Sequence, residues 1–155
     1  MEYYPLEIKK INFSIEKQLC IFFHDLIQNR DDLFFHPHPF TSEYAKIISY
    51  YSGEDLYYVL TEKNAILGYA MLRGWDEGYE IPSLGIIIHY TVRNRGFGKL
   101  FMTFLHHAAK MKGAKKIRLK VHPSNKKAIQ LYQNLGYVFN DMEKTELIGF
   151  YDYRK

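Results

Sequence analysis

The sequence predicts an α/β fold with a mixed β-sheet, in which strands and helices follow one another along 155 residues. Three observations support this prediction. Apolar residues recur at helical spacing in four segments and alternate with polar residues in several others. Glycine and proline mark the boundaries between these segments. No repeat or interdomain linker interrupts the chain, so residues 1–155 are expected to form a single domain.

The N-terminal region predicts one strand followed by two helices. Residues 4–11 alternate in polarity as a strand does. Residues 14–30 place apolar side chains at helical spacing, and Ser14 is in position to cap that helix. A loop with two prolines comes next. It leads into a short helix that Thr41 or Ser42 would cap.

The middle of the chain predicts three strands. Residues 56–74 read as two strands around a tight turn at Lys63 and Asn64. A glycine-bounded loop separates them from the next predicted strand, at residues 79–90. Pro82 cannot donate a hydrogen bond to a strand ladder, so this strand is expected to begin irregularly or to carry a bulge there.

The C-terminal part contains the clearest amphipathic helix. From Phe97 to Met111, apolar residues recur at positions i, i+3, i+4 and i+7, and Gly113 would end the helix. The remaining elements are a strand, a short helix and two more strands, at residues 115–121, 122–136, 137–141 and 146–154.

Charge is distributed unevenly along the chain. Residues 81–140 contain no Asp or Glu and eleven Lys and Arg, a charge of +11, whereas the rest of the chain carries −7. A run of like charge is often a solvated face. The skew of a whole segment instead favours an anionic partner such as phosphates or nucleic acid.

Composition excludes several classes of protein. No stretch approaches the roughly 18 uncharged apolar residues of a transmembrane helix. The N-terminus lacks the layout of a signal peptide, so a cytoplasmic location is expected. Cys20 is the single cysteine, which excludes an internal disulfide and leaves no cysteine-based metal site.

Residues 89–101, HYTVRNRGFGKLF, place two glycines and three cations between a predicted strand and a predicted helix. Phe101 stands where a dinucleotide-binding loop needs its third glycine, and Arg93 and Leu100 break the pattern of a P-loop. The remaining pattern, R-x-x-G-x-G, still predicts an anion site of free amide groups at a helix N-terminus, with Gly96 and Gly98 letting a phosphate approach. A glycine-rich turn with solvated arginines is the alternative.

These residues resemble the GNAT superfamily of N-acetyltransferases. Arg93, Gly96 and Gly98 match its Q/R-x-x-G-x-G/A motif. The resemblance extends over about residues 56–140, although Tyr90 stands where many members have proline. A second family stretch is matched in register by Val121, Asn125, Ala128, Tyr132, Gly136 and Tyr137.

The resemblance implies a mostly antiparallel sheet flanked by about four helices, and transfer of acetyl from acetyl-CoA to a primary amine. The pyrophosphate would lie on the Arg93–Lys99 turn, and the pantetheine arm beside the fourth strand. The ribose phosphate would meet Lys99, Lys126 or Lys127. The implied cofactor-binding residues are Ile86, Ile87, Ile88, Arg93, Asn94, Arg95, Gly96, Phe97, Gly98, Lys99, Asn125, Ala128 and Tyr132.

Catalysis in this family needs few groups. The backbone amide near Ile88 would polarise the thioester carbonyl, and Tyr132 would protonate the departing thiolate unless it only packs. Glu80 is the candidate base that accepts the proton of the amine, although it could also be an exposed loop carboxylate. The further candidates for the base are His89, Glu77 and Tyr79.

The acceptor pocket of the family would lie between residues 34–40 and residues 73–80. Asp76 and Glu77 would attract a cationic amine, and the acceptor would be a small metabolite such as an amino sugar or its nucleotide-linked form. The aromatic residues there could equally be ordinary packing. Two histidines without further ligands do not predict a metal site. The candidate substrate-binding residues are Phe35, His36, His38, Trp75, Glu77 and Tyr79.

Two other classes of function stay open. A non-catalytic acyl-CoA-binding or regulatory domain would share the same fold. A nucleic-acid-binding module would use the basic segment, but the aromatic residues are mostly at core spacing and no nucleic-acid motif appears. The expected partners are therefore acetyl-CoA and a small amine, with no nucleic acid and no membrane. The resemblance to the family adds a second copy of the chain as an expected partner.

Overall fold

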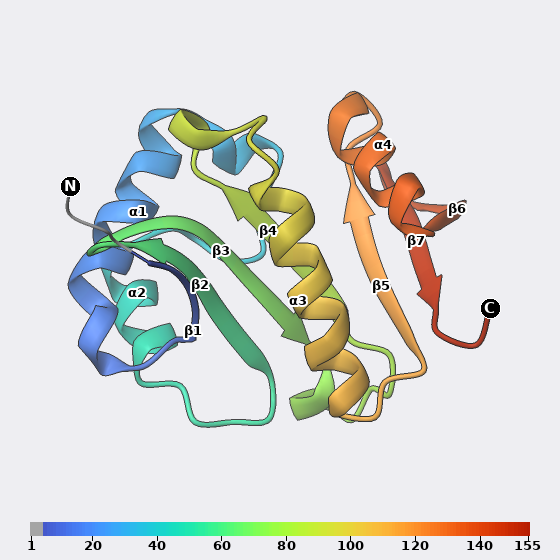
Figure 1. Cartoon of the computed structure of the whole chain (residues 1–155), viewed down its shortest axis with the longest axis horizontal. Coiled ribbons are helices and arrows are strands. Elements are labelled where there is room, and N and C mark those ends of the chain that lie inside the picture. Colours follow the sequence, from blue (N-terminus) through green and yellow to red (C-terminus); the bar gives the residue numbers. More distant parts are fainter. Residues whose placement is uncertain (1–4) are drawn as a thin grey trace.

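The structure is a computed structural model that describes residues 5–155; Tyr4, at the start of the first predicted strand, lies outside the described residues. Within that range seven strands form one sheet in the order β1-β2-β3-β4-β5-β7-β6 (Figure 1). The β4–β5 pair is parallel and the other neighbouring pairs are antiparallel. The mixed, mostly antiparallel sheet expected from the sequence is confirmed.

The elements alternate along the chain as the sequence predicts. The strands are β1 (Leu6–Lys10), β2 (Leu56–Glu62), β3 (Ala65–Arg73), β4 (Ser83–Ile88), β5 (Lys116–Val121), β6 (Val138–Glu143) and β7 (Glu146–Asp152). The helices are α1 (Glu16–Gln28), α2 (Ser42–Ser49), α3 (Phe97–Met111) and α4 (Lys126–Leu135). Short 3₁₀ turns are η1 (Phe13–Ile15), η2 (Asp31–Leu33), η3 (Trp75–Glu77) and η4 (Tyr90–Val92).

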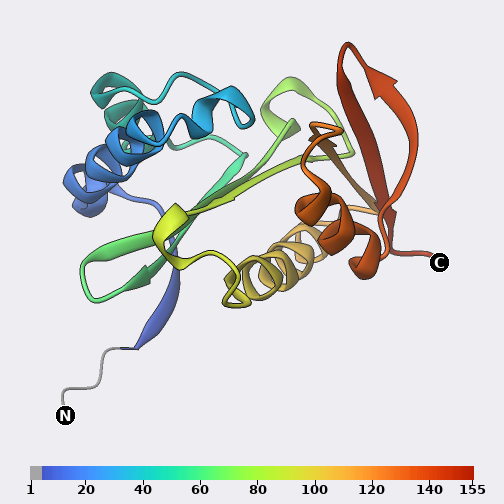
Figure 2. The same cartoon turned by 90° about the horizontal axis from the view of Figure 1, so that it is seen from above.

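The helices cover both faces of the sheet. Figure 2 shows α1 and α2 on one side, with α3 and α4 on the other. Phe22 and Phe23 of α1 are buried against Tyr69 of β3, whereas Phe101 and Leu105 of α3 are buried in a second core that includes the inward residues of β5. The apolar faces that the sequence predicts for α1 and α3 are thus the faces that are buried against the sheet.

The ends of the helices and strands agree in part with the sequence predictions. The Thr41 hydroxyl accepts a hydrogen bond from the Tyr44 amide, as expected of a cap for α2. The prediction for Ser14 is wrong, because Ser14 lies inside η1 and its amide donates instead to the Asn12 side chain. Strand β4 begins only after Pro82, which agrees with the missing donor of proline.

Strands β4 and β5 diverge soon after they meet. In the described residues their pairing consists of Ser83 with Arg118 and Leu84 with Leu119. From Gly85 onward β4 remains paired with β3 but not with β5. This divergence positions the candidate site.

Candidate active site

The backbone of β4 offers unpaired hydrogen-bonding groups where it leaves β5. The Pro82 carbonyl accepts a hydrogen bond from the Arg118 amide, and the His89 amide donates to Leu67 of β3. Since backbone groups alternate in direction along a strand, even-numbered residues of β4 face β5 and odd-numbered residues face β3. Ile86 and Ile88 therefore direct their amide groups toward the space that β5 has left.

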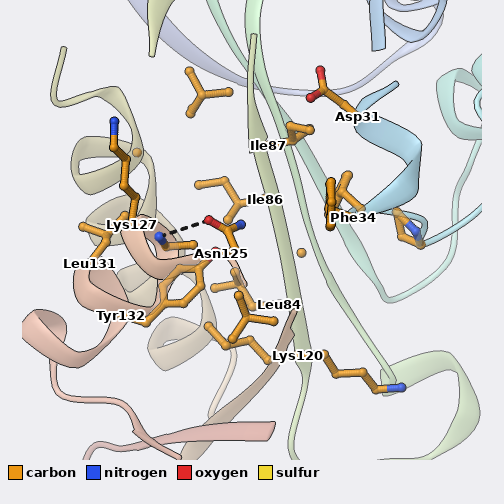
Figure 3. A pocket seen from close by; sticks show the side chains of 18 of the residues that line it. Asp31, Phe34, Leu84, Ile86, Ile87, Lys120, Asn125, Lys127, Leu131 and Tyr132 are labelled. Atoms are coloured by element: carbon orange, nitrogen blue, oxygen red, sulfur yellow. Dashed lines mark hydrogen bonds between the residues drawn. The ribbon is translucent and has the colours of Figure 1, made fainter. Parts of the chain in front are cut away.

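A cavity of about 1130 Å³ occupies this divergence. Its walls are β4, β5, the turn before α3 and the start of α4 on one side, and residues 34–37 and the β6–β7 hairpin on the other. Figure 3 shows Asn125, Lys127 and Tyr132 on one side of the central strands, with Asp31 and Phe34 on the other. Because drug-sized ligands occupy pockets of about 300–1,000 Å³, this volume can hold more than one small ligand.

The turn before α3 is shaped to expose amide groups. Asn94 and Gly96 adopt left-handed backbone conformations, with φ of 63° and 84°. Among residues 5–155 no side chain caps the first turn of α3, so its amide groups can bind a ligand, and the helix dipole places partial positive charge there. This arrangement fits the anion site predicted from the sequence.

The two glycines of the turn have different surroundings. A Cβ atom on Gly96 would meet open space, so Gly96 supplies the left-handed conformation and leaves room above the turn. A Cβ atom on Gly98 would lie 3.3 Å from Leu131 of α4. Gly98 thus permits the close approach of α3 and α4, and phosphate clearance is not its evident role.

The basic side chains of the turn lie differently from the expectation. The Arg93 guanidinium donates to the Ile88 carbonyl at 3.0 Å and pairs with the Asp31 carboxylate at 2.9 Å. Arg95 lies over the ring of Phe97. Neither Arg95 nor Lys99 lines the cavity. Arg93 thus lines the cavity but is paired with Asp31, whereas Arg95 and Lys99 are outside the cavity lining.

Helix α4 contributes a cation and a cap. Among the lysines considered for the ribose phosphate, Lys127 lines the cavity and Lys126 does not. The Lys127 ammonium group donates to the Asn94 side chain at 3.3 Å. Asn125 accepts from the Ala128 amide and so caps α4, with both residues at the cavity wall (Figure 3).

Tyr132 combines burial with access to the cavity. The residue is 9% exposed, and it lines the cavity together with Asn125. Burial raises the pKa of Tyr132 to about 12, so the phenol remains protonated throughout the neutral range. The position can donate a hydrogen bond to a ligand in the cavity.

The two histidines of residues 34–40 have different surroundings. His36 is exposed and lines the cavity together with Phe35, whose ring lies 3.3 Å from the Cβ position of Gly85. His38 is buried, bonds the Tyr69 hydroxyl at 2.8 Å and stacks on Tyr44. Burial lowers the pKa of His38. The substrate-binding role predicted for His38 therefore conflicts with a side chain enclosed in the core.

The loop between β3 and β4 lies away from the cavity, near the C-terminal end of α3 (Figure 1). The Lys112 ammonium group lies 4.9 Å from the centre of the Trp75 ring, and Asp76 bonds the Tyr51 hydroxyl and the Glu54 amide. Three further residues of this segment are exposed and absent from the cavity lining: Glu77, Tyr79 and Glu80. The structure does not bring this group of predicted residues to the cavity.

His89, a further candidate for the base, is held by other groups. Its ring bonds the Asp25 carboxylate at 2.8 Å and the Thr91 hydroxyl at 2.7 Å. The ring also packs against Phe22 and Tyr90. These contacts fix the end of β4 against α1.

The sequence analysis did not predict a cluster of polar side chains that lines the cavity near the start of β4. These side chains come from four different strands: Arg73, Ser83, Arg118, Lys120 and Glu143. The alternation of basic and apolar residues along β5 was a signal for part of this group, because it predicts one basic face. Nothing local in the sequence shows that Arg73 faces the same space.

Ion pairs within the described residues neutralise part of the acid-free segment. Its cations bond carboxylates from outside that segment, so the +11 charge overstates the attraction for an anionic partner. The paired cations are Arg93, Lys112, Lys116, Arg118 and Lys120.

Two kinds of site are absent from residues 5–155. No group of three or more His, Cys, Asp or Glu side chains could hold a metal ion. No helix has the length and apolar character that crossing a membrane requires.

Comparisons with known proteins identify the family. The model of the acetyltransferase (GNAT) family matches residues 23–137. No curated protein sequence is significantly similar to the chain. Solved structures are similar in fold at low sequence identity.

Three of these structures illustrate the similarity. The GNAT domain of PAT from S. lividans has a TM-score of 0.81 at 11% identity, covering 95% of this chain and 90% of that one. The GNAT-family acetyltransferase from Streptococcus pneumoniae has a TM-score of 0.79 at 20% identity, covering 96% and 99%. The PaiA N-acetyltransferase from Thermoplasma acidophilum, in complex with coenzyme A, has a TM-score of 0.75 at 15% identity, covering 96% and 99%. Because the family model matches well over half of this chain, the chain belongs to the acetyltransferase (GNAT) family and is an N-acetyltransferase.

Proposed function

We propose that the protein transfers the acetyl group of acetyl-CoA to a primary amine of a small molecule. One observation carries this proposal: the divergence of β4 and β5 leaves backbone amides of Ile86 and Ile88 unpaired in the cavity that the first turn of α3 also lines. A ligand with an extended, amide-containing arm and an anionic group at one end would bind both the unpaired strand amides and the amides at the start of α3.

The residues present fit acetyl-CoA. Ile86 would pair with the pantetheine arm as an added strand does. The free amides of the turn from Asn94 to Gly98 would hold the pyrophosphate, and the Lys127 ammonium would add a positive charge beside it. A coenzyme A complex of a protein with the same fold supports this assignment.

Acetyl-CoA supplies an activated acetyl thioester, so the chain needs no covalent nucleophile. The Ile88 amide, which faces the cavity, would donate a hydrogen bond to the thioester carbonyl oxygen and so stabilise the negative charge that develops there in the transition state. Tyr132 would donate a hydrogen bond to the departing sulfur. Its pKa of about 12 exceeds the value of roughly 8.5 for an ordinary thiol, so complete proton transfer to the thiolate is uphill and the phenol acts chiefly as a donor.

A base must remove the proton of the incoming amine. Glu80, the candidate from the sequence, is exposed and outside the cavity lining. His36 lines the cavity on the acceptor side, and imidazole is the side chain best suited to proton removal near neutral pH. We therefore propose His36 as the first candidate and keep Glu80 as the second.

A coenzyme A release assay tests the proposed function. The purified protein and acetyl-CoA are incubated with single amines from several classes: amino sugars, amino acids, polyamines and short peptides. We expect release of free thiol and formation of the N-acetyl product with at least one small amine. Acetylation of peptides alone would contradict the small-molecule acceptor, and thermal stabilisation by acetyl-CoA without turnover of any amine would favour a non-catalytic domain.

A further inference from the structure

A row of polar side chains crosses three strands at the start of β4. Arg73 of β3 is directly opposite Ser83 of β4, which is opposite Arg118 of β5. Directly opposed residues project from the same face of a sheet. The Arg118 guanidinium lies 3.4 Å from the Ser83 hydroxyl, and all three side chains line the cavity.

The row lies on the acceptor side of the sheet. Gly85, two residues after Ser83, shares its face and lies against the Phe35 ring, on the side that α1 and α2 cover. Leu84 and Ile86 point the opposite way, into the core around α3. The side chains of the row therefore project away from the face that carries α3, α4 and Tyr132.

Positive charge is in excess at this row. Arg118 and Lys120, which follows it on the same face of β5, share a single carboxylate, that of Glu143. Arg73 donates to the Pro37 carbonyl at 3.1 Å and has no ion-pair partner among residues 5–155. Arg73, Arg118 and Lys120, together with Lys144, thus face two carboxylates, those of Glu143 and Glu146, in the cavity lining.

We propose that this row binds an anionic group, a carboxylate or a phosphate, that the amine acceptor itself carries. This inference rests on the proposed acetyl transfer and narrows the acceptor to an amine with a second, negatively charged end. Bidentate hydrogen bonding by arginine suits both kinds of anion.

The spacing within β4 restricts the acceptor further. Ser83 and Ile86 are three residues apart, which is about 10 Å along an extended strand. The amine must reach the thioester beside Ile86 and Ile88 while its anionic end lies near Ser83. An acceptor whose amine and anion are several bonds apart meets this requirement better than an α-amino acid.

A purely structural role makes a different prediction. If Arg73 only anchors Pro37, and Arg118 and Lys120 only hold Glu143 of β6, then neutralising a member of the row lowers the stability of the fold. It does not change the preference among acceptors. The ratio of rates for an acceptor with an anionic group and an acceptor without one, measured in the same variant, separates the two roles.

The experiment uses acceptor pairs that differ in the group opposite the amine. γ-Aminobutyrate is compared with putrescine, and glucosamine phosphate with glucosamine, by kcat/KM at saturating acetyl-CoA. We expect the anionic member of at least one pair to be preferred by about tenfold or more. A larger preference in the γ-aminobutyrate pair indicates a carboxylate acceptor. A larger preference in the glucosamine phosphate pair indicates a phosphate acceptor.

Variants connect that preference to the row. Arg73→Gln should reduce the preference about ten- to hundredfold through a higher KM for the anionic acceptor, with the KM for acetyl-CoA unchanged. Arg73→Lys should restore part of it. Lys116→Gln is the matched control, because Lys116 lies on the same face of β5 as Arg118 but outside the cavity lining. An unchanged preference in Arg73→Gln, or no preference in the unaltered protein, would overturn the proposal.

A binding measurement separates this proposal from the proposed function. Calorimetric titration of the protein with glucosamine phosphate or γ-aminobutyrate, in the presence of coenzyme A, requires no turnover. Anion-dependent binding that Arg73→Gln abolishes, in a protein that acetylates no amine, would support the anion site and contradict the enzyme activity. Turnover of neutral amines without such binding would contradict the anion site alone.

Discussion

Arg93 and Asp31 lie 62 positions apart in the sequence, yet their guanidinium and carboxylate groups are joined at 2.9 Å. Arg93 belongs to the turn before α3, and Asp31 begins η2, which leads into the acceptor-side segment at residues 34–37. Asp31 is largely buried, with 11% of its side chain exposed, whereas 40% of the Arg93 side chain is exposed. The pair connects the two sides of the cavity.

Asp31→Asn should weaken the binding of both substrates. A partly exposed ion pair contributes up to about 1 kcal/mol, so we expect KM for acetyl-CoA and for the acceptor to rise by up to roughly fivefold. Steady-state kinetics measures both constants. Asp32→Asn is the control, since Asp32 also lies in η2 and forms no ion pair in the described part of the chain. Equal effects of the two variants would show that the pair itself is unimportant.

Gly96→Ala and Gly113→Ala separate backbone strain from function. Both glycines have positive φ, 84° and 96°, with open space at the Cβ position. Each substitution should lower the free energy of unfolding by about 1 kcal/mol, because an L-residue is disfavoured there. Urea denaturation measures this loss. Gly96→Ala alone should also weaken acetyl-CoA binding, and loss of binding in Gly113→Ala would contradict the assignment of the turn.

Tyr132→Phe should lower kcat by about ten- to hundredfold with little change in the affinity for coenzyme A, because it removes a donor and keeps the ring. Tyr137→Phe is the matched control: Tyr137 is also buried, and its hydroxyl bonds His106 outside the cavity. Pre-steady-state acetyl transfer and calorimetry measure the two quantities. An unchanged rate in Tyr132→Phe would show that the Tyr132 side chain packs in the core and does not take part in the reaction.

His36→Asn should lower kcat/KM more than Glu80→Gln does, because only His36 lines the cavity. Loss of the base should also change the pH–rate profile, because a general base must be unprotonated to accept the proton of the amine. The profile of kcat/KM between pH 5 and pH 9 tests both variants. If Glu80→Gln alone removes the acidic limb, the original assignment from the sequence is the right one.

His106 should make the fold sensitive to acid. Burial lowers the pKa of His106 to about 4, below the value of about 6.5 in the unfolded chain, and His107 adds to the shift. The unfolded state therefore binds the proton first, and stability falls as pH decreases from 6.5 toward 4. After allowance for the partial exposure of the ring, we expect about 1 kcal/mol of stability to be lost between pH 7 and pH 5.

Urea denaturation at these two pH values tests the role of His106. In His106→Asn the loss of stability should shrink, while His38, whose pKa burial also lowers, stays in both proteins. His24→Asn replaces an exposed histidine and serves as the control. An equal pH dependence in His106→Asn and the unaltered protein would contradict the prediction.

Features with a local cause could be predicted from the sequence. The period of the apolar residues located α3, and the missing donor of Pro82 anticipated the late start of β4. The pattern of Gly96 and Gly98 located the turn at the N-terminus of α3. In each case the interaction that decides the structure involves residues close together in the sequence.

Features that depend on strand order could not be predicted from the sequence. Glu80 and Trp75 lie in the loop that leads from β3 into β4, but the direction of β4 places them away from the cavity, near the end of α3. Arg73 faces the cavity only because β3 lies beside β4 and β4 beside β5. The partner of Arg93 could not be foreseen either, because Asp31 approaches it only after α1 and the sheet have packed.

The short contact between β4 and β5 also has a mechanical consequence. Apart from helix packing, the described sheet consists of two antiparallel halves, β1–β4 and β5–β7, joined by the residue pairs at Ser83 and Leu84. Forces that pull the halves apart concentrate at this seam, whose other end is open. A ligand that hydrogen-bonds Ile86 and Ile88 within the opening would stabilise the open end of this seam. Mechanical separation of the two halves should therefore require a higher force in the ligand-bound protein than in the free protein.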